Sequence, residues 1–269
     1  MVSYTPTYGL PAPSLGEAPN VPADIAALAD GTESALLALA MLPVDNLLIN
    51  GGFGINQRAA SSYTRTSGQT GYTVDRWILT SGTGATNIVT PTAIATGSFA
   101  GAPRWKLAWN RSVAGSANSY LEQRIEDVRT AAGKNITVSL SAAVASGTAD
   151  ITISVVQNFG TGGSPSSETS PVVSSTITVD TSVSTRRVAT LAVPSISGKT
   201  IGSDENSYLS IRINRASGAG TGTIDLWDAG AVIGAVDRPF LPRSPAAELM
   251  RCQRYYYQSG PYGSSKIFA

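Results

Sequence analysis

The chain has 269 residues, of which 42% are hydrophobic and 14% charged, and its formal net charge is +1. This composition allows one large β domain or two smaller ones, and the near-neutral charge predicts no nucleic-acid partner. The chain has no histidine and one cysteine, Cys252, which excludes His-based acid–base catalysis, Ser-His-Asp and Cys-His nucleophilic sites, Cys/His zinc sites and any intrachain disulfide.

Residues 1–21 contain four prolines and two glycines, a density that predicts an extended arm lying along a partner. Residues 1–9 lack the basic start and the apolar core of a secretory signal peptide. We therefore expect a product that is made in the host cytoplasm.

Residues 22–42 predict a helix that Pro22 and Asp24 begin and Pro43 ends. Asp30 and Glu33 lie inside the apolar run 25–42 and argue against membrane insertion. The predicted oligomerisation residues follow the a/d spacing of a coiled coil and are Ile25, Leu28, Thr32, Ala35, Leu39 and Leu42. The helix either packs on its own domain or forms a homo-oligomer. We favour a trimer, because the flanking prolines leave little of the same chain to cover it.

From residue 46 onward apolar and polar residues alternate in short runs, separated by turns rich in Gly, Ser and Asn. The predicted strands are at 104–109, 121–125, 136–144, 151–156, 173–179, 187–193, 207–214 and 223–236. Many short antiparallel strands predict a mainly β fold, a jelly-roll β-sandwich. Ser244, Pro245 and Glu248 then predict the start of a short helix.

The stretch from Asn46 to Trp77 predicts two buried strands, 47–49 and one that ends on Trp77. Phe53 serves as an aromatic anchor. Gly51 and Gly52 predict a turn with positive φ between the strands. The predicted organisation is an arm at 1–21, a coiled-coil helix at 22–43, a jelly roll at 46–240, and a short helix with a tail at 241–269.

Four patches, in order, resemble phage tail-fibre and minor tail proteins whose central module is similar to galactose-binding-like, carbohydrate-binding jelly rolls. The patches are Asn46–Trp77, Leu121–Thr130, Val193–Leu209 and Arg238–Tyr256. The resemblance implies a virion component that attaches to other virion proteins by its N-terminus, presents the jelly roll to host-surface glycan and is released by lysis. Such proteins usually carry a further β-rich segment after the Cys-Gln-Arg-Tyr-Tyr signature. The shorter chain here is expected to be an adaptor or a decorating fibre.

The tryptophans have two interpretations, core packing or stacking on sugar rings. Trp105 and Trp109 share a face with Leu107, so alternation favours the core; the same question holds for Trp77 and Trp227. Ligand-binding residues are not assigned from the sequence.

Tyr255–Tyr257 cannot all face one way in a strand, so at least one should be exposed or lie at a subunit contact, with ligand contact as the second interpretation. Cys252 is expected to be a buried apolar residue.

Glu122 with Glu126, and Asp204 with Glu205, are the carboxylate pairs that glycoside hydrolysis would need. Arginines two positions before and after Glu126-Asp127 favour surface ion pairs instead. The sequence therefore predicts no catalytic residues, no enzymatic role, no cofactor and no metal site. Three alternatives stay open: a head fibre or capsid decoration protein, a cellular carbohydrate-binding module, and a tailspike-type polysaccharide depolymerase.

Overall fold

The computed structural model describes residues 3–4, 11–12, 21–40, 46–99, 102–183 and 185–258. The chain divides into two compact units, Met1–Val44 and Asp45–Ala269. They are called the N-terminal unit and the sandwich domain below, and each is described by itself.

The N-terminal unit contains two short strands and one helix. β1 (Ser3–Tyr4) pairs antiparallel with β2 (Pro11–Ala12), and α1 spans Val21–Ala40. Two short pieces of the segment that is predicted to be a single extended arm are therefore paired with each other. The helix begins one residue earlier than the sequence predicts and is described as far as Ala40.

The predicted coiled-coil residues lie along α1 as far as the structure describes them. Ile25 and Leu28 are 61% and 46% exposed, and the Thr32 hydroxyl donates to the Leu28 carbonyl at 2.7 Å. Ala35 and Leu39 lie within α1, and Leu42 lies outside the described residues. The trimer stays a prediction. Among the described residues, neither helix combines the length and the apolar character that crossing a membrane requires.

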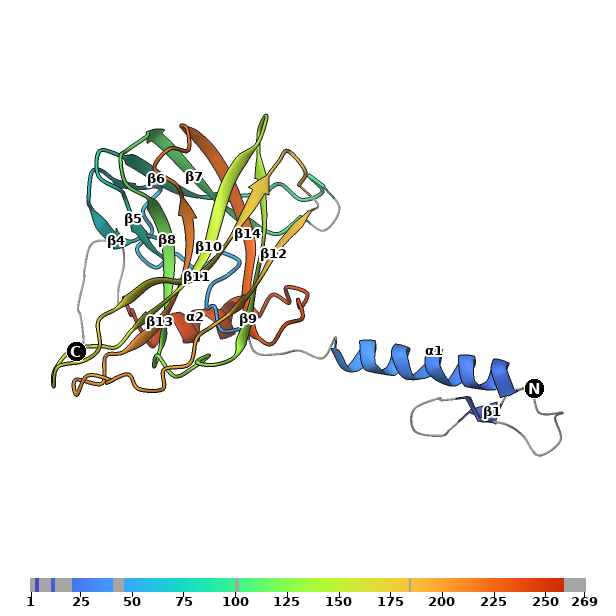
Figure 1. The fold of residues 1–269 in the computed structure, drawn as a ribbon. Helices are drawn as coiled ribbons and strands as arrows, with labels where there is room; N and C mark the ends of the chain where they lie inside the picture. The colour runs from blue at the N-terminus through green and yellow to red at the C-terminus, as the bar shows by residue number, and fades with distance from the viewer. Residues whose placement is uncertain are drawn as a thin grey trace. The chain divides into compact units, whose positions relative to one another are not determined.

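Two antiparallel six-stranded sheets form the sandwich domain (Figure 1). The β8 sheet has the order β11-β10-β13-β8-β5-β4, with β4 Thr70–Tyr72, β5 Ile78–Thr80, β8 Ser119–Glu126, β10 Ala149–Asn158, β11 Thr169–Val179 and β13 Tyr208–Arg215. The β9 sheet has the order β12-β9-β14-β7-β6-β3, with β3 Tyr63–Arg65, β6 Thr86–Ala93, β7 Trp105–Val113, β9 Asn135–Val144, β12 Arg186–Ala192 and β14 Gly222–Ile233.

The core lies between the two sheets and is filled by alternate residues of their strands. Its fully buried side chains include Leu107, Trp109, Leu121, Ile136, Leu140, Ile151, Leu209 and Leu226. Since every strand pair is antiparallel and the inner faces interdigitate, the prediction of a jelly-roll β-sandwich is confirmed.

The opening stretch of the domain is buried as predicted, but it is not a strand. Leu48 and Ile49 are 1% and 8% exposed. The Ile49 N–H donates to Oε1 of Gln123 at 2.7 Å, and Gln123 Nε2 donates to the Ile49 carbonyl at 2.8 Å. A side-chain amide thus satisfies the backbone groups that a neighbouring strand would otherwise pair, which is why no strand forms at 47–49.

The second predicted strand is also wrong at its end, since Trp77 lies in the turn between β4 and β5. Trp77 is fully buried, donates its indole N–H to the Asn50 carbonyl at 3.0 Å and packs on Phe53 with ring centroids 5.2 Å apart. The left-handed residues of this loop are Asn50 (φ 58°) and Phe53 (φ 56°) and not the glycines. Gly51 is required for a different reason: a Cβ there would lie 2.0 Å from a backbone carbonyl oxygen.

The short C-terminal helix forms where the sequence predicts it. α2 spans Pro245–Gln253, and the Ser244 hydroxyl caps it by accepting the Ala247 N–H at 3.3 Å. Cys252 is 1% exposed and carries a free thiol, as expected, and burial raises its pKa to about 12. The helix therefore joins the core of the sandwich domain.

The first and last of the four patches, Asn46–Trp77 and Arg238–Tyr256, pack against each other. The Arg76 guanidinium lies 3.4 Å from the centre of the Tyr255 ring, and the Arg58 guanidinium lies 3.9 Å from the centre of the Tyr256 ring. Gln57 Nε2 also donates to the Tyr256 carbonyl at 2.9 Å. These patches are therefore part of the scaffold that closes one end of the sandwich.

Candidate functional site

The outer face of the β8 sheet carries aromatic and charged side chains together. On β8, Leu121 and Gln123 are buried toward the core, so the alternation of the strand turns Tyr120, Glu122 and Arg124 outward. The central strands of this sheet lie side by side in Figure 1. This outward set is called the β8 face below.

A buried ion-pair cluster lies at the centre of the β8 face. Glu122 is 1% exposed and accepts from Arg212 Nε at 2.8 Å, from Arg124 Nη2 at 2.9 Å and from the Ser210 hydroxyl at 2.9 Å. Burial alone would raise the pKa of Glu122, but the hydrogen bonds and the charges of Arg212 and Arg124 outweigh it and hold the pKa below its usual range. The carboxylate is ionised at neutral pH and fixes both guanidinium groups in place.

Tyrosines lie on both sides of this cluster. The Arg212 guanidinium lies 4.4 Å from the centre of the Tyr120 ring, and the Arg124 guanidinium lies 4.5 Å from the centre of the Tyr208 ring. Tyr72, at the end of β4, is 46% exposed. Cation–π contacts therefore hold two of the rings in fixed positions on the sheet.

The strand register sets the length of the β8 face. Asn214 pairs with Tyr120, and Tyr208 pairs with Glu126, six positions further along β8. At about 3.4 Å per residue the two tyrosines lie roughly 20 Å apart along the strands. The face thus offers apolar rings at both ends and the guanidinium groups of Arg124 and Arg212 between them, which together suit a ligand with apolar C–H faces and many hydroxyls.

The four tryptophans do not contribute to the β8 face. Trp77, Trp109 and Trp227 are at most 4% exposed, which confirms core packing for these three. Trp105 differs from the prediction, since it is only half-buried and lines a pocket. It is the first residue of β7, so its inward side chain extends past the end of the core onto the backbone of Gly54.

The carboxylate pairs named from the sequence are engaged in ion pairs and hydrogen bonds. Asp127 pairs with Arg129 at 3.1 Å, as predicted, whereas Glu126 pairs with Arg254 of the C-terminal segment. Asp204 accepts the Thr161 hydroxyl at 2.7 Å in an exposed loop. Among the described residues, no three Cys, Asp or Glu side chains lie close enough to hold a metal ion.

Tyr255–Tyr257 follow α2 and do not form a strand. Tyr257 is 51% exposed, in agreement with the expectation that at least one of the three is exposed. The other two stack on arginines of the opening patch, a role that the sequence could not show because their partners lie almost 200 residues away.

No protein-family model matches this chain, and no curated protein matches it. Solved structures are similar to it. A cyclase from Fischerella sp. TAU is 11% identical, with a TM-score of 0.45, over 72% of this chain and 100% of the cyclase. The family 11 carbohydrate-binding module from Clostridium thermocellum is 14% identical, with a TM-score of 0.38, over 66% and 99%. The enzymatically active domain of bacteriophage CBA120 tailspike protein 4 is 12% identical, with a TM-score of 0.39, over 70% of this chain and 21% of that chain.

The prediction that the chain is not an enzyme is corrected by these comparisons, because the similar structures include cyclases and an enzymatically active tailspike domain. The chain has no histidine, which removes particular mechanisms but does not exclude an enzyme. The similar structures also include carbohydrate-binding modules.

Proposed function

We propose that the sandwich domain recognises a glycan on the β8 face and that the chain is a phage virion component, a tail-fibre or minor tail protein that serves host adsorption. The observation that carries the glycan proposal is the arrangement of Tyr120 and Tyr208 around the Glu122 cluster. Sugar rings present C–H faces to aromatic rings and hydroxyls to charged or amide groups, and the β8 face offers both kinds of partner in fixed positions.

The virion role rests on the four sequence patches described above. In this proposal the N-terminal unit attaches the chain to other virion proteins, and α1 joins three copies. Three weak sites on one particle bind far more tightly than one, because the second and third contacts form at high effective concentration. A head fibre or decoration protein built from the same parts is the second candidate.

Binding of the purified chain to immobilised oligosaccharides and polysaccharides tests the glycan proposal. We expect a Kd per site in the high-micromolar to millimolar range, since a shallow sugar contact gains only about 4–6 kcal/mol. Tyr120→Ala and Tyr208→Ala should each weaken binding about tenfold, in line with the loss of one aromatic contact of about 1 kcal/mol or more.

Tyr257→Ala is the matched control, because this exposed tyrosine lies outside the β8 face. Binding that survives in the two face variants would place the glycan site elsewhere, and a panel without any bound glycan would remove the proposal. Electron microscopy of intact particles then separates tail from head: density for this chain on neither part would overturn the virion role. Chromatography of the bound glycan reports whether recognition leads to chemical change.

A further inference from the structure

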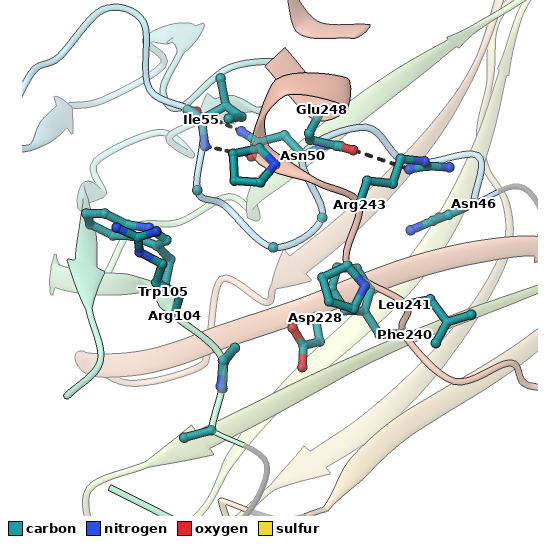
Figure 2. A pocket seen from close by; sticks show the side chains of 17 residues that line it. Asn46, Asn50, Ile55, Arg104, Trp105, Asp228, Phe240, Leu241, Arg243 and Glu248 are labelled. Carbon is teal, nitrogen blue, oxygen red and sulfur yellow. Dashed lines mark hydrogen bonds and ion pairs between the residues drawn. The ribbon is translucent and has the colours of Figure 1, made fainter. Parts of the chain in front are cut away.

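A pocket of about 700 Å³ lies in the sandwich domain, away from the β8 face (Figure 2). It is formed by the 50–55 loop, the residues before and at the start of β7, a bulge in β14 and the 240–248 segment. This volume is typical of a small-molecule site. Two aromatic side chains, Trp105 and Phe240, line it.

Both aromatic rings are packed on glycine backbone. A Cβ built on Gly54 would lie 3.1 Å from Cδ1 of Trp105, and one on Gly52 would lie 3.6 Å from the ring of Phe240. The glycines therefore let both rings lie close to the loop backbone at the wall of the pocket.

A β-bulge brings the Asp228 side chain to the same pocket. The pairing of β14 with β9 shifts between Trp227 and Gly230, and Asp228 has a φ of 51°. A left-handed conformation is uncommon for a residue other than glycine, and bulges often redirect a side chain toward a site. In Figure 2 the Asp228 side chain lies between Trp105 on one side and Phe240 on the other.

Within the described part of the chain, no hydrogen bond or ion pair engages the Asp228 carboxylate. Arg186, the nearest cation behind it, donates Nη1 to the Asp228 backbone carbonyl at 2.9 Å and pairs through Nε with Asp237 at 3.2 Å. Burial raises the pKa of Asp228 to about 6, against the opposing charge of Arg186. The carboxylate is thus mainly ionised at neutral pH but lacks a partner, an arrangement that costs stability and is typical of functional sites.

Among the described residues, the other charged side chains that line the pocket do not pair with the Asp228 carboxylate. Arg243 pairs with Glu248 at 3.4 Å, and Glu248 also accepts the Asn50 N–H. Arg104 is exposed. Of the two carboxylates that line the pocket, Glu248 is paired with Arg243, whereas Asp228 has no ion-pair partner among the described residues and lies beside two aromatic rings.

We propose that this pocket binds a small organic ammonium ion, whose charge pairs with the Asp228 carboxylate and whose apolar body lies between Trp105 and Phe240. A cation removes the cost of the unpaired carboxylate and is attracted to aromatic faces. An anion would be repelled, and a neutral ligand would leave the charge without a counterion. The proposal does not depend on glycan binding at the β8 face.

Calorimetric titration of the full chain with 2-phenylethylamine tests the proposal. 2-Phenylethanol and 3-phenylpropionate are the matched probes, because they keep the ring and change only the charge. At pH 7.5 we expect the amine to bind about 10- to 100-fold more tightly than the alcohol, the range that a charged hydrogen bond supplies, and the propionate not to bind. Equal binding of amine and alcohol, or no binding of the amine, would overturn the proposal without any variant.

Asp228→Asn tests the residue itself, since asparagine tolerates the left-handed conformation. This variant should bind the amine no better than the alcohol. Asp225→Asn is the matched control on the same strand, because Asp225 pairs with Lys106 at 2.6 Å and does not line the pocket. In the wild type the amine affinity should fall about tenfold from pH 7.5 to pH 5, as Asp228 gains a proton, and it should stay constant in Asp228→Asn. Unchanged amine affinity in Asp228→Asn would exclude the carboxylate as the partner.

Discussion

Asp228→Asn should make the ligand-free sandwich domain more stable at neutral pH, because it removes a charge that the fold holds without a partner. The pKa of Asp228 is about 6 in the fold, above its ordinary value of 3.8. A raised pKa means that the folded state binds the proton more tightly than the unfolded state does. The contribution of this group to stability is therefore fully present below about pH 4 and is lost as the pH rises through about 6.

The size of the effect follows from the pKa difference. A shift of roughly two pKa units corresponds to about 3 kcal/mol between the two protonation states, most of it lost between pH 4 and pH 7. The variant keeps a neutral side chain throughout, so its advantage over the wild type should grow by about 2–3 kcal/mol across this range. For a domain of this size that is about 4–12 °C in Tm at pH 7.

Urea denaturation followed by tryptophan fluorescence at pH 4, 5, 6 and 7 measures this difference. Subtraction of the wild-type curve cancels the other carboxylates, including Glu122, whose lowered pKa acts in the opposite direction. A flat difference for Asp228→Asn would refute the reasoning, since it would show that the carboxylate is solvated in the fold.

Three further predictions concern other parts of the chain. Gly51→Ala should lower the free energy of unfolding by about 3 kcal/mol or more in urea denaturation, because its methyl group would meet a backbone carbonyl oxygen at 2.0 Å. Gly68→Ala is the control: with φ of 71° in open space it should cost only about 1 kcal/mol. Equal losses would contradict the close approach at Gly51. Glu122→Gln should lower the free energy of unfolding by about 3–5 kcal/mol at pH 7 and by less as the pH falls through the lowered pKa of the wild-type carboxylate. A loss independent of pH in thermal melts would argue against the ion pairs. Light scattering should show a trimer for the wild type and a monomer for the double variant of Ile25→Asp and Leu28→Asp; equal masses would remove α1 as the oligomerising element.

The fold was predictable from the sequence where alternation is regular. Apolar and polar residues alternate around Leu107, Leu121 and Leu140, so each run shows the period of two that is typical of a sandwich strand. Ser244 marks the start of α2 by a local rule. The opening stretch could not be assigned correctly, because the partner of Ile49 is a side chain 74 positions later.

The candidate sites were less predictable, because each depends on register. The cluster around Glu122 needs Arg212 opposite it, and the sequence does not state which strands are neighbours. Asp228 shows no local signal, since the bulge that directs it arises from the pairing of β14 with β9. Alternation predicts toward which face of the sheet the Trp105 side chain points, but it does not predict where along the strand the core ends. Trp105 is the first residue of β7 and lies at that end, so the prediction of core packing was wrong for it.

The stacking of Tyr256 on Arg58 has a consequence for synthesis of the chain. Gln57 and Tyr256 are 199 positions apart, and translation adds roughly 5–20 residues each second. Gln57 and Arg58 therefore emerge from the ribosome about 10–40 s before the tyrosine on which they pack. The contacts that join the opening stretch to the end of the sandwich domain can form only after nearly all of that domain has been synthesised.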